Sequence, residues 1–152
     1  SRQLVYESGG WKENLLMNQD GDFFSRILMI ASKAYFISNA KVYYRIGEYS
    51  TVSKANSENK LVSLLDSYIS YKENALIHKD NLRVRKALSY NFTYFIYLYG
   101  NKYPALYKKA KDQVENLGVG FQLRKKSPRI RFVSKILGFE NLMAIRRIIS
   151  KE

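Results

Sequence analysis

Residues 18–31 read NQDGDFFSRILMIA and set the expected secondary structure of the first part of the chain. Apolar side chains recur here at spacings of three and four residues, which is typical of an amphipathic helix. They are Phe24, Ile27, Leu28 and Ala31. Asp22 and Arg26 lie four residues apart, so we expect them to pair on the exposed face of this helix.

The segments on either side of this helix differ from each other. Before it, SRQLVYES predicts a short helix that ends at Gly9-Gly10, because glycine readily takes the left-handed conformation after a helix. After it, AYFIS and KVYYR are rich in aromatic and β-branched residues and flank Ser38-Asn39, which predicts a strand, a turn and a strand. A polar loop is expected over residues 46–57.

From residue 57 onward the pattern is helical. Asp80 is expected to cap a helix that runs to Gly100, and Pro104 fits the first turn of a helix that stops near Gly118. A short basic helix after Pro128 and a last helix follow. The expected fold class is therefore mainly α, with about six helices and one small β-hairpin.

Composition limits the kinds of chemistry available. The chain of 152 residues has no cysteine and a single histidine, His78, which excludes disulfides, thiolate metal sites and histidine clusters. Its formal charge is +13, and residues 121–152 carry nine Lys or Arg against Glu140 and Glu152. Such an excess favours an anionic partner. No apolar run reaches the roughly 20 residues that a membrane-spanning helix needs.

The acidic stretch NQDGDFF allows three interpretations. Asn18 or Asp20 can cap the helix while Asp22 complements its dipole, Asp20 and Asp22 can bind a divalent ion, or one carboxylate can act as a general base. A calcium loop of the EF-hand type is excluded, because Phe23 and Met29 stand where that motif needs glycine and glutamate.

The order of features over residues 9–53 resembles the C-terminal part of the catalytic region in bacterial family-two glycosyltransferases of the GT-A fold. In that family a Gly-Gly-aromatic turn precedes an acidic motif whose aspartate opens a helix. An arginine on this helix, a hydrophobic strand, a strand that ends in Tyr-Arg and a serine-containing loop follow. The matching pieces are Gly9-Gly10-Trp11, Gln19-Asp20, Arg26, AYFI, Tyr43-Tyr44-Arg45, and Ser50 and Ser53.

The resemblance implies roles for individual residues. Asp20 is expected to be the catalytic base that deprotonates an acceptor hydroxyl as it attacks the anomeric carbon of a nucleotide sugar, with inversion. Trp11, Gln19, Gly21 and Arg45 are expected to contact substrates, with Arg45 near the donor diphosphate. The chain departs from the family in having Gln19 where relatives often have glutamate, and Gly47 where many have histidine.

The resemblance also implies a division of the chain. Residues 1–56 correspond to the acceptor-side end of the GT-A catalytic domain, residues 57–120 to a helical C-terminal extension, and residues 121–152 to a basic amphipathic helical tail. The sequence does not begin with methionine, and we expect it to be a piece of a longer chain. The nucleotide-binding half, with an Asp-x-Asp motif and a bound Mg²⁺ or Mn²⁺, is expected upstream, so this piece alone should be inactive.

The basic tail suggests a second function class, a noncatalytic helical module that binds an anionic membrane surface or nucleic acid. In residues 121–152 a face formed by Ile130, Val133, Ile136 and Leu137 is bordered by Arg129, Arg131 and Lys135, which favours a membrane surface. Nucleic acid is not expected as the partner, because the tyrosines occur at core spacing and no nucleic-acid-binding motif is present. We expect a cytoplasmic protein peripheral to the inner face of the cell membrane.

Overall fold

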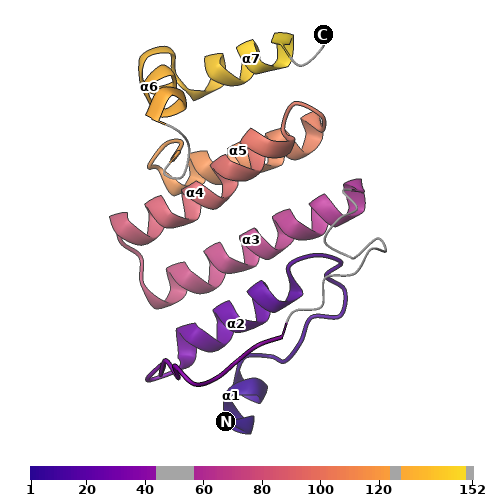
Figure 1. Ribbon diagram of the computed structural model, residues 1–152, viewed down its shortest axis with the longest axis vertical. Coiled ribbons are helices and arrows are strands. Elements are labelled where there is room, and N and C mark those ends of the chain that lie inside the picture. Colours follow the sequence, from indigo (N-terminus) through magenta and orange to yellow (C-terminus); the bar gives the residue numbers. More distant parts are fainter. Residues whose placement is uncertain (44–56, 124–127, 150–152) are drawn as a thin grey trace. The chain divides into compact units, whose positions relative to one another are not determined.

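The computed structural model of the chain describes residues 1–43, 57–123 and 128–149. Within these ranges the chain forms seven helices, labelled in Figure 1. They are α1 (Arg2–Glu7), α2 (Gln19–Ile30), α3 (Glu58–His78), α4 (Leu82–Tyr99), α5 (Pro104–Leu117), α6 (Pro128–Leu137) and α7 (Phe139–Ile149). The chain divides into two compact units, Ser1–Asn74 and Ala75–Glu152, so the boundary falls inside α3.

The first unit contains α1, α2 and most of α3. As predicted, α1 ends at a Gly-Gly turn, where Gly9 and Gly10 have φ angles of 77° and 68°. This left-handed backbone strains side chains with a Cβ, and two glycines allow the chain to turn sharply toward α2. In α3, Leu61, Leu64 and Leu65 are buried, as their spacing on one helical face leads one to expect.

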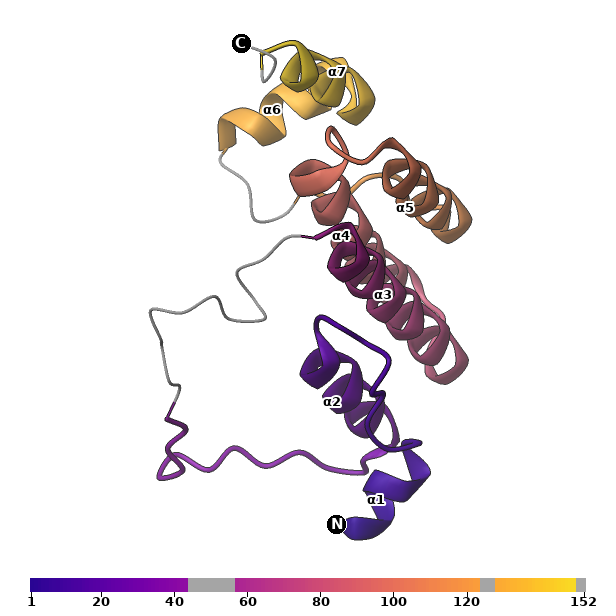
Figure 2. The same cartoon turned by 90° about the vertical axis from the view of Figure 1, so that its right-hand side faces the viewer.

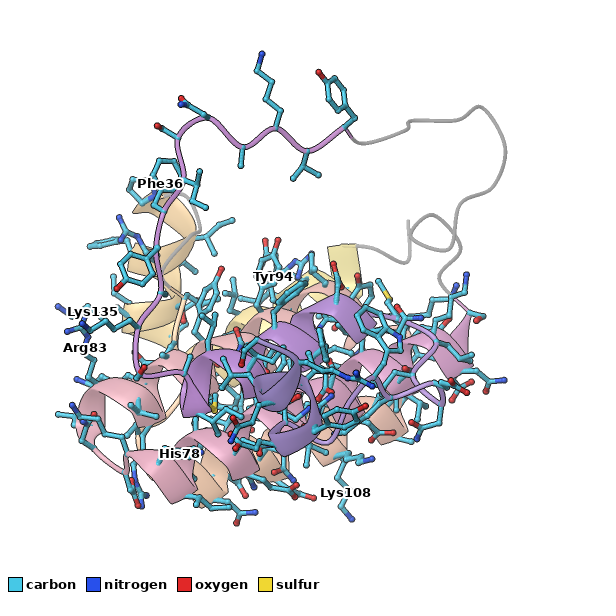
Figure 3. The ribbon with its side chains drawn as sticks, turned by 90° about the horizontal axis from the view of Figure 1, so that it is seen from below. Phe36, His78, Arg83, Tyr94, Lys108 and Lys135 are labelled. Carbon is cyan, nitrogen blue, oxygen red and sulfur yellow. The ribbon has the colours of Figure 1, made fainter. Side chains whose placement is uncertain are left out.

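The predicted β-hairpin is wrong. The part of the chain that the structure describes has no strand, and residues 34–43 follow α2 as an unpaired segment (Figure 2). A turn does form, with Ala40 N donating to Ile37 O at 3.2 Å. Phe36, labelled in Figure 3, is 94% exposed. Aromatic and β-branched residues favour a strand only when they pack against a neighbouring surface, and two strands alone are marginal in water.

The second unit has its core between α4 and α5, which lie side by side (Figures 1 and 2). Helix α5 buries Leu106, Ala110, Val114 and Leu117, whose spacing of three and four residues places them on one face. Helix α4 contributes Leu88, Phe92, Phe95 and Ile96. None of the helices in the described ranges is long and apolar enough to cross a membrane.

The start of α4 differs from the prediction that Asp80 is its cap. Asn81 is the N-cap, and its side chain accepts a hydrogen bond of 2.9 Å from Val84 N. Asp80 instead pairs with Arg85 at 2.5 Å. Asn and Asp are about equally good caps, so local sequence could not rank these two neighbours.

Candidate functional site

Asp22 and Arg26 form a buried ion pair in α2, and Arg26 joins this helix to the turn that follows α1. Asp22 is 0% exposed, and its Oδ2 accepts hydrogen bonds from Arg26 Nε at 3.0 Å and lies 2.8 Å from Arg26 Nη2. The expectation that this pair lies on the exposed face of α2 is therefore wrong. The pairing itself is confirmed, but Phe24 and Leu28 of the predicted apolar stripe are the exposed residues.

Arg26 also fixes the Gly-Gly turn. Its Nη1 donates to the carbonyl of Ser8, and its Nη2 donates to the carbonyl of Gly10 at 2.8 Å. A cation at this position satisfies carbonyl groups that follow the C-terminal end of α1. One guanidinium thus joins the end of α1, the turn that precedes Trp11, and the first turns of α2.

Lys12 is a second cation beside Asp22. Its Nζ lies 3.3 Å from Asp22 Oδ1 and donates to Ser70 Oγ of α3 at 2.9 Å. Burial by itself would raise the pKa of Asp22, but hydrogen bonds from Ser70 and Arg26 and the charges of Lys12 and Arg26 outweigh it, so the pKa lies below its usual range. Asp22 is therefore an ionised structural carboxylate at neutral pH.

A stripe of serine hydroxyl groups on α3 faces the segment before α2 and forms hydrogen bonds with it. Ser63 Oγ accepts hydrogen bonds from Leu16 N at 2.7 Å and from Met17 N at 3.2 Å. Ser67 and Ser70 continue the same face and are buried. Sequence reasoning missed this stripe, although serines at 63, 67 and 70 have the spacing of one helical face.

Asn18 connects the start of α2 to that stripe. It occupies the N-cap position with a φ of 64°, but its side chain makes no capping hydrogen bond. Instead, its Nδ2 donates to Ser67 Oγ at 2.8 Å and to Tyr71 Oη at 2.6 Å. The predicted capping role of the Asn18 side chain is thus replaced by a contact with α3, which fixes the place where α2 begins.

Asp20 differs from Asp22 in its surroundings. It is exposed in the first turn of α2, and its Oδ1 accepts a hydrogen bond of 2.8 Å from Gly21 N. Of the two carboxylates, Asp20 is the one that solvent or a bound molecule can reach. The described part of the chain contains no group of three His, Cys, Asp or Glu side chains that could hold a metal ion.

Gly21 packs closely against the contact between α2 and α3. A Cβ built on it would lie 2.3 Å from both Asn18 Oδ1 and Tyr71 Oη. The structure therefore gives a packing reason for glycine here, in addition to the predicted contact with an acceptor. Gln19 is partly exposed beside it.

Aromatic side chains lie beside Asp20. Trp11 is 51% exposed, and its ring centroid is 5.1 Å from that of Phe23. Residues three and four apart are neighbours on a helix surface, so Phe23 and Phe24 flank Asp20 on α2. The structure thus brings Trp11, Gln19, Asp20 and Gly21 into one region of the first unit. Arg45, the remaining predicted contact, lies outside the described residues.

Comparison with known proteins adds no further information on the site. No family model, curated protein or solved structure matches the chain.

Proposed function

We propose that the chain is the acceptor-side, C-terminal part of an inverting glycosyltransferase, which moves a sugar from a nucleotide-sugar donor to a glycan or lipid-linked acceptor. The observation that supports this proposal is the contrast between the two carboxylates of α2. Asp22 is buried and neutralised by Arg26 and Lys12, whereas Asp20 is exposed two residues earlier. Such a contrast is expected of a site in which one carboxylate reacts with the substrate and its neighbour has a structural role.

The proposed chemistry needs a base at the acceptor hydroxyl. Asp20 accepts the hydroxyl proton as the acceptor oxygen forms its bond to the anomeric carbon. The bond from that carbon to the donor phosphate breaks, the nucleoside diphosphate leaves with the electron pair, and the configuration inverts. General base catalysis of this kind contributes about 10²–10⁴-fold to the rate.

The surroundings of Asp20 suit a sugar acceptor. The exposed ring of Trp11 and the rings of Phe23 and Phe24 offer apolar faces next to a polar helix start. Binding sites commonly combine such faces with a few oriented polar groups. In the proposal Trp11, Gln19 and Gly21 contact the acceptor, while Arg45 contacts the donor diphosphate.

The proposal places donor and metal binding in another part of the enzyme. The described residues contain no metal-ligand cluster, and Asp22 is committed to Arg26 and Lys12. The residues around Asp20 therefore do not fit an Mg²⁺ or Mn²⁺ site, and Asp20 acts in the proposal as a base alone.

The experiment is a transfer assay with the full-length protein. It is incubated with Mg²⁺ and a panel of donors (UDP-glucose, UDP-galactose, UDP-N-acetylglucosamine and GDP-mannose), and release of nucleoside diphosphate is measured with a membrane extract as the acceptor source. We expect acceptor-dependent release with one donor, and an anomeric proton coupling in the product that shows inversion. A parent gene without an upstream nucleotide-binding domain would refute the proposal.

A further inference from the structure

The basic C-terminal tail consists of two helices that differ in how they are held. Helix α7 is anchored on the second unit by apolar contacts: Phe139, Leu142 and Met143 are buried, and the ring of Phe139 stacks on Phe121 with centroids 4.4 Å apart. Three apolar side chains of α7 are thus used within its own unit, while Ile145 and Ile148 are exposed.

Two charged contacts reinforce this anchor. The guanidinium of Arg146 lies 3.8 Å from the centre of the Tyr97 ring, and its Nη1 donates to the Tyr97 carbonyl. Glu140 Oε1 lies 2.5 Å from Lys111 Nζ of α5. Helix α7 therefore uses one of its arginines inside the fold, so that arginine is not available to an external anion.

Helix α6 has the opposite character. Of its side chains that the structure describes, none is buried. Phe132 and Ile136 are 65% and 64% exposed, and Leu137 is also exposed. Phe132 and Ile136 are four residues apart and lie along one ridge of the helix, with Arg131 and Lys135 on the adjacent ridge. Both cations are exposed.

We propose that the α6 surface, made of Phe132, Ile136 and Leu137 with Arg131 and Lys135, binds the surface of an anionic lipid bilayer. The apolar side chains enter the boundary between headgroups and acyl chains, and the two cations remain at the level of the lipid phosphates. This arrangement is typical of short interfacial helices. Helix α6 contains no acidic residue, so its charge complements an anionic surface.

Other occupants fit the α6 surface less well. Nucleic acid would use the cations and could stack a base on Phe132, but it gives no role to Ile136 and Leu137. A second copy of the chain would need about 800 Å² from each partner, far more than three side chains supply, and would bring like charges together. A bilayer uses both the apolar and the basic ridge.

The test is co-sedimentation of the 152-residue chain with vesicles. Phosphatidylcholine vesicles with about 30% phosphatidylglycerol should pellet the protein at low salt, high salt should weaken binding, and pure phosphatidylcholine should bind little. The double variant Arg131→Ala/Lys135→Ala should bind about 30-fold less, since each cation near the surface contributes about fivefold. Its matched control is Arg83→Ala/Lys108→Ala, which removes two exposed cations from α4 and α5 and should bind like the unchanged protein. Arg83, Lys108 and Lys135 are labelled in Figure 3.

A second pair of variants separates insertion from charge attraction. Phe132→Ala/Ile136→Ala should lower vesicle binding by about tenfold or more, whereas Ile77→Ala/Leu82→Ala, which removes exposed apolar groups elsewhere in the second unit, should not. Normal vesicle binding by Phe132→Ala/Ile136→Ala would overturn the proposal. Tighter binding of the unchanged protein to a 20-nucleotide single-stranded DNA than to vesicles would also overturn it, provided that the variant Phe132→Ala/Ile136→Ala still binds this DNA.

Hydrogen exchange gives a readout on the unchanged protein. Amides of α6 should exchange more slowly when phosphatidylglycerol vesicles are present, while those of α5 should not change. Equal protection of both helices, or of neither, would contradict a membrane contact through α6. Neither measurement depends on sugar transfer, so this proposal and the proposed function can fail separately.

Discussion

Replacing Asp22 with asparagine keeps the size of this side chain but removes its charge. Arg26, whose side chain is 8% exposed, would then be a buried cation without its anionic partner, although its hydrogen bonds to the Ser8 and Gly10 carbonyls remain. Removing one member of a buried pair costs about 3–5 kcal/mol. The Lys12 side chain is 38% exposed and can turn to water. We therefore expect a loss near the lower end, about 3 kcal/mol.

This loss corresponds to a fall of roughly 12 °C or more in the melting midpoint, because 1 kcal/mol shifts a unit of this size by about 4–8 °C. Trp11 is the chain's single tryptophan and lies in the first unit, so its fluorescence follows the unfolding of that unit. Asp20→Asn is the matched control, since it makes the same change at an exposed position two residues away and should shift the midpoint little. A midpoint for Asp22→Asn within about 2 °C of the unchanged protein would refute the structural role of this pair.

Three further outcomes follow from the same contacts. The pKa of Asp22 is lowered in the folded state. Its stabilising effect is therefore complete above the unfolded value near 4 and is lost as the pH falls through the folded value. The melting midpoint followed by Trp11 fluorescence should drop between about pH 5 and pH 3, and should drop less in Asp22→Asn. Gly21→Ala should cost about 1–2 kcal/mol in urea unfolding, because its Cβ displaces the hydrogen-bonded Asn18 and Tyr71, and an unchanged urea midpoint would contradict this packing. Arg146→Lys keeps the charge but loses the planar contact with Tyr97 and should destabilise the second unit by about 1 kcal/mol; equal urea midpoints by circular dichroism would argue against the anchor of α7.

The helices could be predicted because their signals are local. Pro104 at the first turn and Gly118 after the last turn bound α5, and four apolar residues at helical spacing form its buried face. Such signals depend on neighbouring residues in the sequence, so they do not require knowledge of the tertiary fold.

The hairpin and the burial of Asp22 could not be predicted in the same way. Residues 34–43 have the composition of strands, but a strand forms only against a partner, which local sequence does not supply. An Asp and an Arg four residues apart look the same on a surface helix and in a buried cluster. In the fold Asp22 contacts Lys12, which in turn donates to Ser70 of α3, 58 residues later in the chain than Lys12.

The sequence named candidate site residues, of which Trp11, Gln19, Asp20 and Gly21 lie in the first unit. Their catalytic and substrate-binding roles stay predictions. Asn18 was expected only as a possible cap. Its contact with Tyr71, which fixes the start of α2, could not be predicted because it joins two segments far apart in sequence.

The measurement that tests the proposed function most directly is donor turnover by Asp20→Asn in the full-length protein. It should be compared with Glu13→Gln, which neutralises another exposed carboxylate of the first unit. We predict that Asp20→Asn lowers the release of nucleoside diphosphate by at least about 10²-fold with an unchanged melting midpoint, while Glu13→Gln retains normal turnover. Turnover by Asp20→Asn close to that of the unchanged enzyme would contradict the assignment of Asp20 as the base.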